Sequence, residues 1–260
     1  MSREQRMNAI LELLWQRGRL DVESTARTLQ VSAATVRRDF DSLAAQQMLT
    51  RTHGGAISNS TASELPLRYK TARHAPEKRR IAEAAAALVS PGMVVGLTGG
   101  TTTTEVARSL ATRADLASDG EGAVTVVTNA VNIANELTLR NHVKIVVTGG
   151  VARPSSYELI GPLAARTLEE LALNMAILGV DALDPELGAM AYNEGEAGIN
   201  RLMAERAQKV IVVTDSSKLT RRALARICRV DQIDVLVTDA DAPADVVARL
   251  SEAGVDVRCV

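Results

Sequence analysis

Apolar side chains recur at helical spacing through the first 57 residues of the chain. The pattern predicts three helices: one that ends at Gly18, one that Asp21 caps and one that Ser32 caps. Their apolar sides can share one core, which indicates a small helical head. The predicted inner residues are Met7, Ile10, Leu11 and Leu14, then Val22, Ala26 and Leu29, then Val36, Phe40 and Leu43.

Farther along the chain, short apolar runs alternate with helical patterns. This alternation predicts an α/β domain, a parallel sheet built from strand–helix–strand units with both faces covered. The apolar runs begin at Met93, Val124, Val143, Met175, Val210 and Ile233, and the helical patterns span about 77–89, 102–112, 130–139, 161–172, 194–208 and 243–252.

A polar stretch separates the two regions. Residues 58–63 are mostly Ser, Thr and Asn, and prolines follow at 66 and 76. We expect a mobile linker at 58–76, between a head at 1–57 and an α/β domain at 77–260. Basic residues between Arg68 and Arg80 fit either a functional basic segment or a solvated run that starts a helix.

Composition and charge narrow the possible partners. The chain is 46% hydrophobic but 2% aromatic, so its core must consist mainly of Ala, Val, Leu and Ile. A net charge of −1 excludes a generally polybasic protein and leaves only local contacts with nucleic acid. Cys228 and Cys259 lack metal-ligand spacing, and we expect free thiols, no metal and no cofactor. The first residues lack the apolar core of a signal peptide, and no run approaches the ~18 apolar residues of a membrane span, so a cytoplasmic location is expected.

The outward face of the third predicted helix suits DNA. With Val36 set inward, a rotation of about 100° per residue turns Ala34 and Arg38 outward and places Arg37 on the flank. Small residues let a helix approach a major groove, and guanidinium groups reach phosphates or guanine edges. Residues 1–57 nevertheless carry a net charge of only +2 (eight Arg, six Asp or Glu), so an ordinary scaffold with solvated arginines is the alternative. The candidate DNA-binding residues are Ser32, Ala34, Thr35, Arg37, Arg38, Arg51, His53 and Gly54.

The ends of the predicted strands carry small, hydroxyl-bearing and charged residues. Carboxyl ends of parallel strands meet in one crevice, and a Gly-Thr loop that opens a helix can bind phosphate. The loop lacks the spacing of a Walker or dinucleotide motif. A tight turn, a helix cap at Asn129 and a solvated Lys218 are the alternatives. The candidate effector-binding residues are Thr98, Gly99, Gly100, Thr101, Thr102, Thr103, Thr128, Asn129, Gly149, Gly150, Arg153, Asp181, Asp215 and Lys218.

Two groups of motifs resemble one known family. VSAATVRRDFDSL and RTHGGA resemble the signature of DeoR-type bacterial regulators, with Phe40 where Leu is usual. GTTT, VTNA, TGG with Arg153, GVDA and DSSK resemble the sensor domain of that family, which is similar in fold to ribose-5-phosphate isomerase. The resemblance implies a winged helix-turn-helix head and a sugar-phosphate sensor. It also implies a repressor of a carbohydrate operon that binds operator DNA as a homo-oligomer, a dimer or tetramer, and that is not an enzyme.

Two positions depart from the family pattern. Thr98 stands where Asp is usual, and Asn200 stands where Lys is frequent. We therefore expect an altered sugar preference. Two other hypotheses stay open: a sugar-phosphate isomerase or deaminase that uses Lys218, Asp215 and Asp181, and a regulator that responds to an unphosphorylated ligand or a protein partner.

Overall fold

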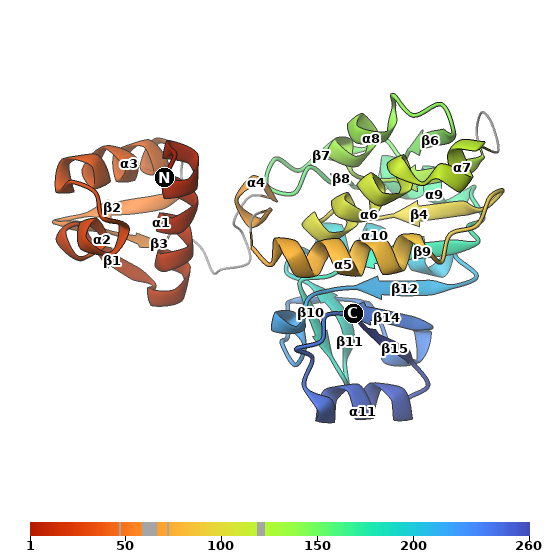
Figure 1. The fold of residues 1–260 in the computed structure, drawn as a ribbon. Coiled ribbons are helices and arrows are strands. Elements are labelled where there is room, and N and C mark those ends of the chain that lie inside the picture. Colours follow the sequence, from red (N-terminus) through yellow and green to blue (C-terminus); the bar gives the residue numbers. More distant parts are fainter. Residues whose placement is uncertain (47, 59–66, 72, 119–122) are drawn as a thin grey trace. The chain divides into compact units, whose positions relative to one another are not determined.

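The computed structural model describes residues 1–46, 48–58, 67–71, 73–118 and 123–260. The chain divides into two compact units, Met1–Tyr69 and Lys70–Val260 (Figure 1). Much of the predicted linker, residues 59–66 and 72, lies outside the described residues. The boundaries of the head at 57 and of the α/β domain at 77 therefore stay predictions.

The N-terminal unit contains the three predicted helices. Gly18 ends the first helix in a left-handed conformation, and the Asp21 carboxylate accepts hydrogen bonds from the backbone N–H groups of residues 23 and 24 at 3.0 Å. The Ser32 hydroxyl caps the third helix through the Thr35 N–H at 3.1 Å. The elements are α1 (Arg3–Arg17), β1 (Arg19–Asp21), α2 (Val22–Leu29), α3 (Ala33–Ala45), β2 (Leu49–Thr52) and β3 (Gly55–Ser58).

The predicted wing is a small antiparallel sheet of order β1-β3-β2. Gly54 takes a φ of 81° in the turn between β2 and β3. A Cβ atom at Gly55 would lie 2.1 Å from the Leu20 carbonyl oxygen, so only glycine lets β3 pair with β1 here. The sequence pattern did not predict β1, because three residues between two helices carry no strand periodicity.

The larger unit is built on a seven-stranded parallel sheet of order β15-β14-β12-β9-β4-β5-β6. All six apolar runs predicted from the pattern form strands of this sheet. The seventh strand, β15, was not predicted. The strands are β4 (Val94–Leu97), β5 (Val124–Thr128), β6 (Val143–Val147), β9 (Met175–Gly179), β12 (Val210–Val213), β14 (Val235–Thr238) and β15 (Asp256–Cys259).

Helices cover both faces of this sheet, as the continuous apolar runs predicted. Met175 and Ile177 of β9 belong to the core under α5, α6 and α8, whereas Ala176 and Leu178 belong to the core under α9, α10 and α11. Figure 1 shows α5 and α6 lying together on one face. The helices are α5 (Ala75–Ala86), α6 (Thr101–Thr112), α8 (Val131–Leu137), α9 (Pro162–Glu169), α10 (Glu194–Glu205) and α11 (Ala244–Glu252), with the short α4 (Leu67–Lys70) and α7 (Ala114–Ser118).

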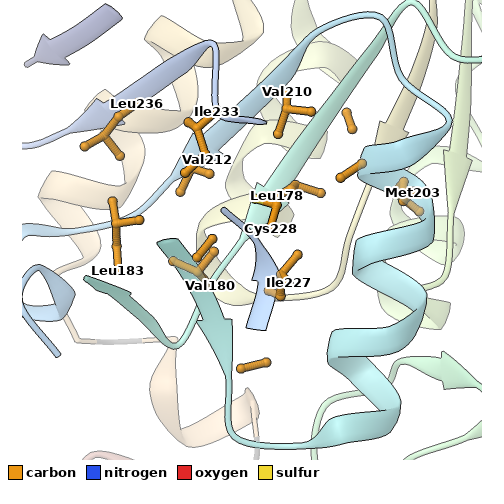
Figure 2. Close-up of a cluster of buried hydrophobic side chains, with 14 of the residues drawn as sticks. Leu178, Val180, Leu183, Met203, Val210, Val212, Ile227, Cys228, Ile233 and Leu236 are labelled. Atoms are coloured by element: carbon orange, nitrogen blue, oxygen red, sulfur yellow. The ribbon is translucent and has the colours of Figure 1, made fainter. Parts of the chain in front are cut away.

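A second, antiparallel sheet of order β10-β11-β13 adds to one core, and the pattern did not predict it. Figure 2 shows Val180, Leu183, Ile227 and Cys228 packing with Leu178 of β9. Short strands rich in Ala and Gly have no alternation to reveal them. The remaining elements are β10 (Ala182–Asp184), β11 (Gly188–Ala191), β13 (Ala225–Cys228), β7 (Val151–Ala152), β8 (Leu159–Ile160), and the 3-10 turns η2 (Ser216–Lys218) and η3 (Val230–Gln232).

Two kinds of feature are absent from the described residues. No helix there combines the length and the apolar character that crossing a membrane requires. No three His, Cys, Asp or Glu side chains in the same residues are placed to hold a metal ion. Cys228 is a buried free thiol, and Cys259 is an exposed one.

Candidate functional site

The exposed face of α3 is the one that the sequence predicted. Ala34, Arg37, Arg38, Asp41 and Ala45 are exposed, while Val36, Phe40 and Leu43 are fully buried. Arg37 Nη2 lies 3.2 Å from Glu23 Oε1 of α2, in a pair that is exposed on both sides. Arg38 makes no hydrogen bond or ion pair with any described residue. Arg38 is therefore open to a ligand, and Arg37 is held only by a surface pair worth about 0–1 kcal/mol.

Asp39, between Arg38 and Phe40, has a structural role that the sequence analysis missed. Its carboxylate is buried and accepts two hydrogen bonds from Arg6, at 2.5 Å from Nε and 3.2 Å from Nη2. This bidentate pair joins α3 to α1 and fixes how the exposed face is presented. A signal was present in the sequence, since Asp39 lies three residues after Val36 and four before Leu43, on the apolar side of the helix.

Residues of the wing divide into two kinds. Arg51 is engaged within the unit: its Nε lies 2.9 Å from Asp41 Oδ1, and its Nη1 donates to the Gly55 carbonyl at 3.0 Å. Its guanidinium also lies 5.5 Å from the centre of the Phe40 ring. His53 and Gly54 are exposed at the hairpin turn. The Ser32 hydroxyl is shared with Thr35, at 2.8 Å between the two oxygens.

In the larger unit, the carboxyl ends of the central strands bring most of the predicted effector residues together. Strands β5 and β6 follow β4 on one side, whereas β9, β12, β14 and β15 extend on the other. The direction of the sheet therefore reverses between β4 and β9, and such switch points are where open α/β sheets bind ligands. Thr98 and Gly99 follow β4, and Gly179 ends β9 beside them.

Thr98 has an inward-facing role in this arrangement. The residue is fully buried, and its hydroxyl accepts from the Gly179 N–H at 2.9 Å and donates to the Gly99 carbonyl at 3.4 Å. The hydroxyl thus ties β4 to β9. Thr98 has no carboxylate to offer a ligand. Its hydroxyl has a partner within the chain both as acceptor and as donor.

The Gly-Thr loop opens α6 without a side-chain cap. Gly100 is the N-cap residue with a φ of 132°, a conformation that favours glycine. The Thr103 and Thr104 hydroxyls donate back to the Gly100 carbonyl at 3.1 and 2.6 Å, and Thr102 and Thr103 are buried. The first N–H groups of this twelve-residue helix consequently have no side-chain acceptor, a state compatible with an anionic ligand.

Two lysines lie on the cationic side of the site. The Lys218 ammonium donates to the Val180 carbonyl at 2.6 Å, one residue beyond Gly179. The residue is half-buried overall, but its ammonium points inward, and burial lowers its pKa while Asp215 opposes that shift. Lys78 of α5 is almost completely buried, and its pKa is lowered to about 8, first by burial and then by the positive charge of Lys218.

Lys78 was not predicted as a site residue. Ile81, Ala82 and Ala85 follow Lys78 by three, four and seven residues, so Lys78 lies on the apolar face of α5. Its ammonium donates to the carbonyl oxygens of Lys70 at 2.9 Å and Arg73 at 2.5 Å. Lys78 therefore holds the segment that directly precedes α5. A lysine at an apolar helical position was the signal that could have identified it.

The opposite side of the site is acidic and includes Glu158, which the sequence analysis also missed. Glu158 is 5% exposed, and its Oε2 accepts from Asn129 Nδ2 at 3.0 Å. Burial raises the pKa of this carboxyl to about 8, Glu196 raises it further, and the hydrogen bond from Asn129 opposes the shift. A residue between two short strands gave no signal in the sequence.

The neighbouring acids have cationic partners. Arg153 Nε lies 3.0 Å from Glu196 Oε1, and burial raises the pKa of Glu196. Asp181 accepts from the Tyr192 N–H at 3.1 Å, and its Oδ1 lies 3.8 Å from Lys70 Nζ.

Other predicted residues have mainly structural surroundings. The Thr128 hydroxyl donates to the Leu97 carbonyl at 2.7 Å. Gly149 and Gly150 both have positive φ, and a Cβ at Gly150 would lie 2.8 Å from the Ile160 carbonyl oxygen. Asp215 is buried beside Ser217, which donates to its carboxylate, and the pKa of Asp215 is lowered mainly by Lys218 against the effect of burial.

Both units match models of known protein families. Residues 6–62 match a DeoR-like helix-turn-helix domain, and residues 73–240 match a DeoR C terminal sensor domain. The chain belongs to the DeoR family. It is a DNA-binding transcriptional regulator rather than an enzyme, and the hypothesis of an isomerase or deaminase is wrong.

Curated relatives extend over almost the whole DeoR-family chain. It is 37% identical over 97% of its length to a protein of Escherichia coli O157:H7 assigned to the aga operon as its transcriptional repressor, covering 92% of that protein. It is 35% identical to the HTH-type transcriptional regulator GlpR of Haloferax volcanii, over 97% of this chain and 96% of that protein. It is 30% identical to the glycerol-3-phosphate regulon repressor of Escherichia coli K12, over 97% of each chain.

Similarity to solved structures is weaker. Ribose 5-phosphate isomerase A of Methanocaldococcus jannaschii aligns with a TM-score of 0.40 and 21% identity, over 56% of this chain and 55% of that one. The full-length sorbitol operon regulator SorC of Klebsiella pneumoniae aligns with a TM-score of 0.43 and 12% identity, over 96% and 99%. With TM-scores this low, neither alignment carries an argument about this DeoR-family protein.

Proposed function

We propose that this protein represses a carbohydrate-utilisation operon and that a phosphorylated sugar controls its binding to operator DNA. The observation that carries the proposal is the position of Lys218: its ammonium lies at the Val180 carbonyl, next to Gly179, which packs against Gly99 just before the uncapped start of α6. The names of its relatives support the class of operon, since they include a glycerol-3-phosphate regulon repressor. One relative at 31% identity is named as an activator of the L-fucose operon, so repression rather than activation is itself part of the proposal.

A phosphate group suits the cationic side of the site for an electrostatic reason. Each ammonium is withdrawn from water, and the two repel one another, which is why the pKa of Lys78 falls. A bound dianion would stabilise both charges. Lys218 contacts the carbonyl of Val180, and Gly179 packs against Gly99, so the lysine and the Gly-Thr loop belong to one neighbourhood.

Lys78 also offers a route by which the effector changes DNA binding. Its ammonium holds two carbonyl groups in the segment before α5. His74, which caps α5, has a φ of 49° and makes no capping hydrogen bond through its side chain. Such a conformation costs on the order of 1 kcal/mol or more outside glycine, so the segment depends on its contacts. A phosphate that engages Lys78 would compete with these carbonyls and alter the segment.

Operator DNA is expected to bind more than one copy of the chain. One recognition helix covers one half-site, and a net charge of +2 on residues 1–57 gives weak attraction to DNA. We propose a homo-oligomer, a dimer or a tetramer, that acts in the cytoplasm where the operator is. The predicted DNA and effector residues remain part of this proposal.

The first test is a mobility-shift assay with the DNA upstream of the protein's own operon. We expect a specific shift at moderate salt with competitor DNA, and Arg38→Ala should weaken it by about 10-fold or more, because a base contact by arginine is worth about 1–3 kcal/mol. Arg37→Ala should have a smaller effect. Arg17→Ala, an exposed arginine at the end of α1, removes the same charge and serves as the control.

Each outcome of this assay has a clear meaning. Absence of any specific shift would contradict the regulatory role on that DNA. Equal losses in the three variants would show that only net charge matters and would remove Arg38 from recognition. Release of wild-type protein by free sugars, with no response to their phosphates, would favour the regulator of an unphosphorylated ligand.

A further inference from the structure

Glu158 is a buried carboxyl group for which the described residues supply no cation. Among the described residues, no Lys, Arg or His side chain forms an ion pair with it. Its neighbours differ, because Glu196 has Arg153 at 3.0 Å and Asp181 has Lys70 at 3.8 Å. The hydrogen-bonding side chains next to Glu158 are the amides of Asn129 and Asn200, and Asn129 Nδ2 lies 3.0 Å from Glu158 Oε2 and 3.3 Å from Asn200 Oδ1. The carboxylates of Glu196 and Asp181 are close enough to raise the pKa of Glu158 further. A lysine at position 200 would provide the missing charge, but this chain has Asn200.

The same region contains a fully buried acceptor without a donor. Asn129 is fully buried, and its Oδ1 has no hydrogen-bond partner although its Nδ2 has two. Glu196 Oε1 and Arg153 Nε also lack hydrogen bonds, but they lie 3.0 Å apart as an ion pair, so Glu196 already has a cationic partner. A buried acceptor without a donor costs about 1–3 kcal/mol. The pattern therefore indicates that a donor-rich group completes the site when the effector binds.

We infer that Glu158 and Asn129 bind a primary ammonium group of the effector, which is then an amino-sugar phosphate. This inference rests on the proposed function, in which the cationic side of the site takes the phosphate. An ammonium carries three donors, no acceptor and one positive charge. It therefore supplies the charge that Glu158 lacks and the donor that Asn129 Oδ1 lacks. A sugar hydroxyl supplies one donor but no charge, so beside it the buried Glu158 would keep the proton that burial favours, whereas an ammonium stabilises the ionised carboxylate.

The position of Glu158 places this amine subsite beside the Gly-Thr loop. A Cβ atom at Gly99 would lie 2.3 Å from Glu158 Cγ and 2.6 Å from Oε1, so the carboxylate rests directly on the backbone of the loop. Gly100, the next residue, opens α6. Glu158 thus contributes the carboxylate that Thr98 does not, from a different segment of the chain.

The test compares paired ligands by titration calorimetry on the full-length protein. The pairs are glucosamine 6-phosphate with glucose 6-phosphate, and the corresponding galactose and mannose compounds. In the pair that binds, we expect the amine to bind at least tenfold more tightly. Glu158→Gln should abolish this preference and retain binding of the parent sugar phosphate. Glu194→Gln, which removes an exposed carboxylate on the first turn of α10, should retain the preference.

A second variant guards against a folding defect in Glu158→Gln. Asn200→Lys supplies an ammonium next to Glu158 from within the chain, and it should lower affinity for the amine at least tenfold while the parent compound binds as before. Equal or tighter binding of the parent sugar phosphate by wild-type protein overturns this inference and leaves the proposed function intact. Binding of none of the six compounds overturns the proposed function and this inference with it.

Discussion

Arg37, Arg38 and Asp39 are consecutive residues of α3, yet each has a different environment. Arg37 pairs with Glu23 on the surface, Arg38 is open, and Asp39 is buried against Arg6. A helix turns about 100° per residue, so the sequence could predict which of these side chains point outward. It could not predict their partners, because Glu23 and Arg6 lie on other helices and meet α3 only through tertiary packing.

The protonation of Glu158 should make stability depend on pH. Its pKa is raised from 4.5 to about 8, so between these values the folded protein keeps a proton that the unfolded chain has released. The free energy of unfolding of the sensor should consequently fall as pH rises from about 5 to 8. Urea unfolding at several pH values measures this decrease, and Glu158→Gln should reduce its slope.

Other groups with shifted pKa values also contribute to the pH dependence of stability. Glu196 has a raised pKa as well, so the variant should keep a smaller dependence of the same sign. The lowered pKa of Lys78, about 8, acts in the opposite direction and only as pH rises above that value. An identical slope in wild type and Glu158→Gln would mean that Glu158 is already ionised at pH 5.

At the scale of elements, the buried face of α5 includes Lys78, which we propose responds to the effector. Lys78→Met keeps a long apolar stem on the buried face but removes the ammonium. We expect this variant to bind operator DNA and to need at least tenfold more effector for half-maximal release, measured by fluorescence anisotropy of labelled DNA. Arg79→Met, at the exposed neighbouring position, is the control. An unchanged midpoint for Lys78→Met would separate Lys78 from effector binding and from the response.

The elements predicted from the sequence were those whose own residues show a strong period. Strands β5 and β6 begin at the predicted residues Val124 and Val143. In contrast, β11 consists of Gly188–Ala191, which has small side chains and no alternation. Such a segment forms a strand because β10 and β13 supply its partners, and that information is tertiary.

At the scale of the molecule, the sequence could predict that strand ends converge but not the order of the strands. The reversal between β4 and β9 depends on how distant units pair. Lys78 and Glu158, the two residues of the candidate effector site that the sequence did not predict, do not lie at the ends of the strands of the large sheet. One precedes the first strand of the sheet, and the other lies between β7 and β8.

The separate cores of the two units predict two unfolding transitions in calorimetry. The N-terminal core and the two sensor cores share no residues. Effector at a hundredfold excess over its dissociation constant adds about 2.7 kcal/mol to the sensor alone. That should raise the sensor transition by roughly 5–10 °C, while the transition of the N-terminal unit stays in place. Operator DNA should shift the other transition. A joint shift of both by effector alone would contradict independent units.

The contact between Gly99 and Glu158 has an evolutionary consequence. A Cβ atom at position 99 would lie 2.3 Å from Glu158 Cγ, so a side chain there requires the Glu158 side chain to move. A shorter residue at position 158 would remove that requirement. The two positions are therefore expected to change together, although they are 59 positions apart in the sequence. Among descendants of this sequence, a new side chain at 99 should be tolerated more readily once Glu158 has been replaced.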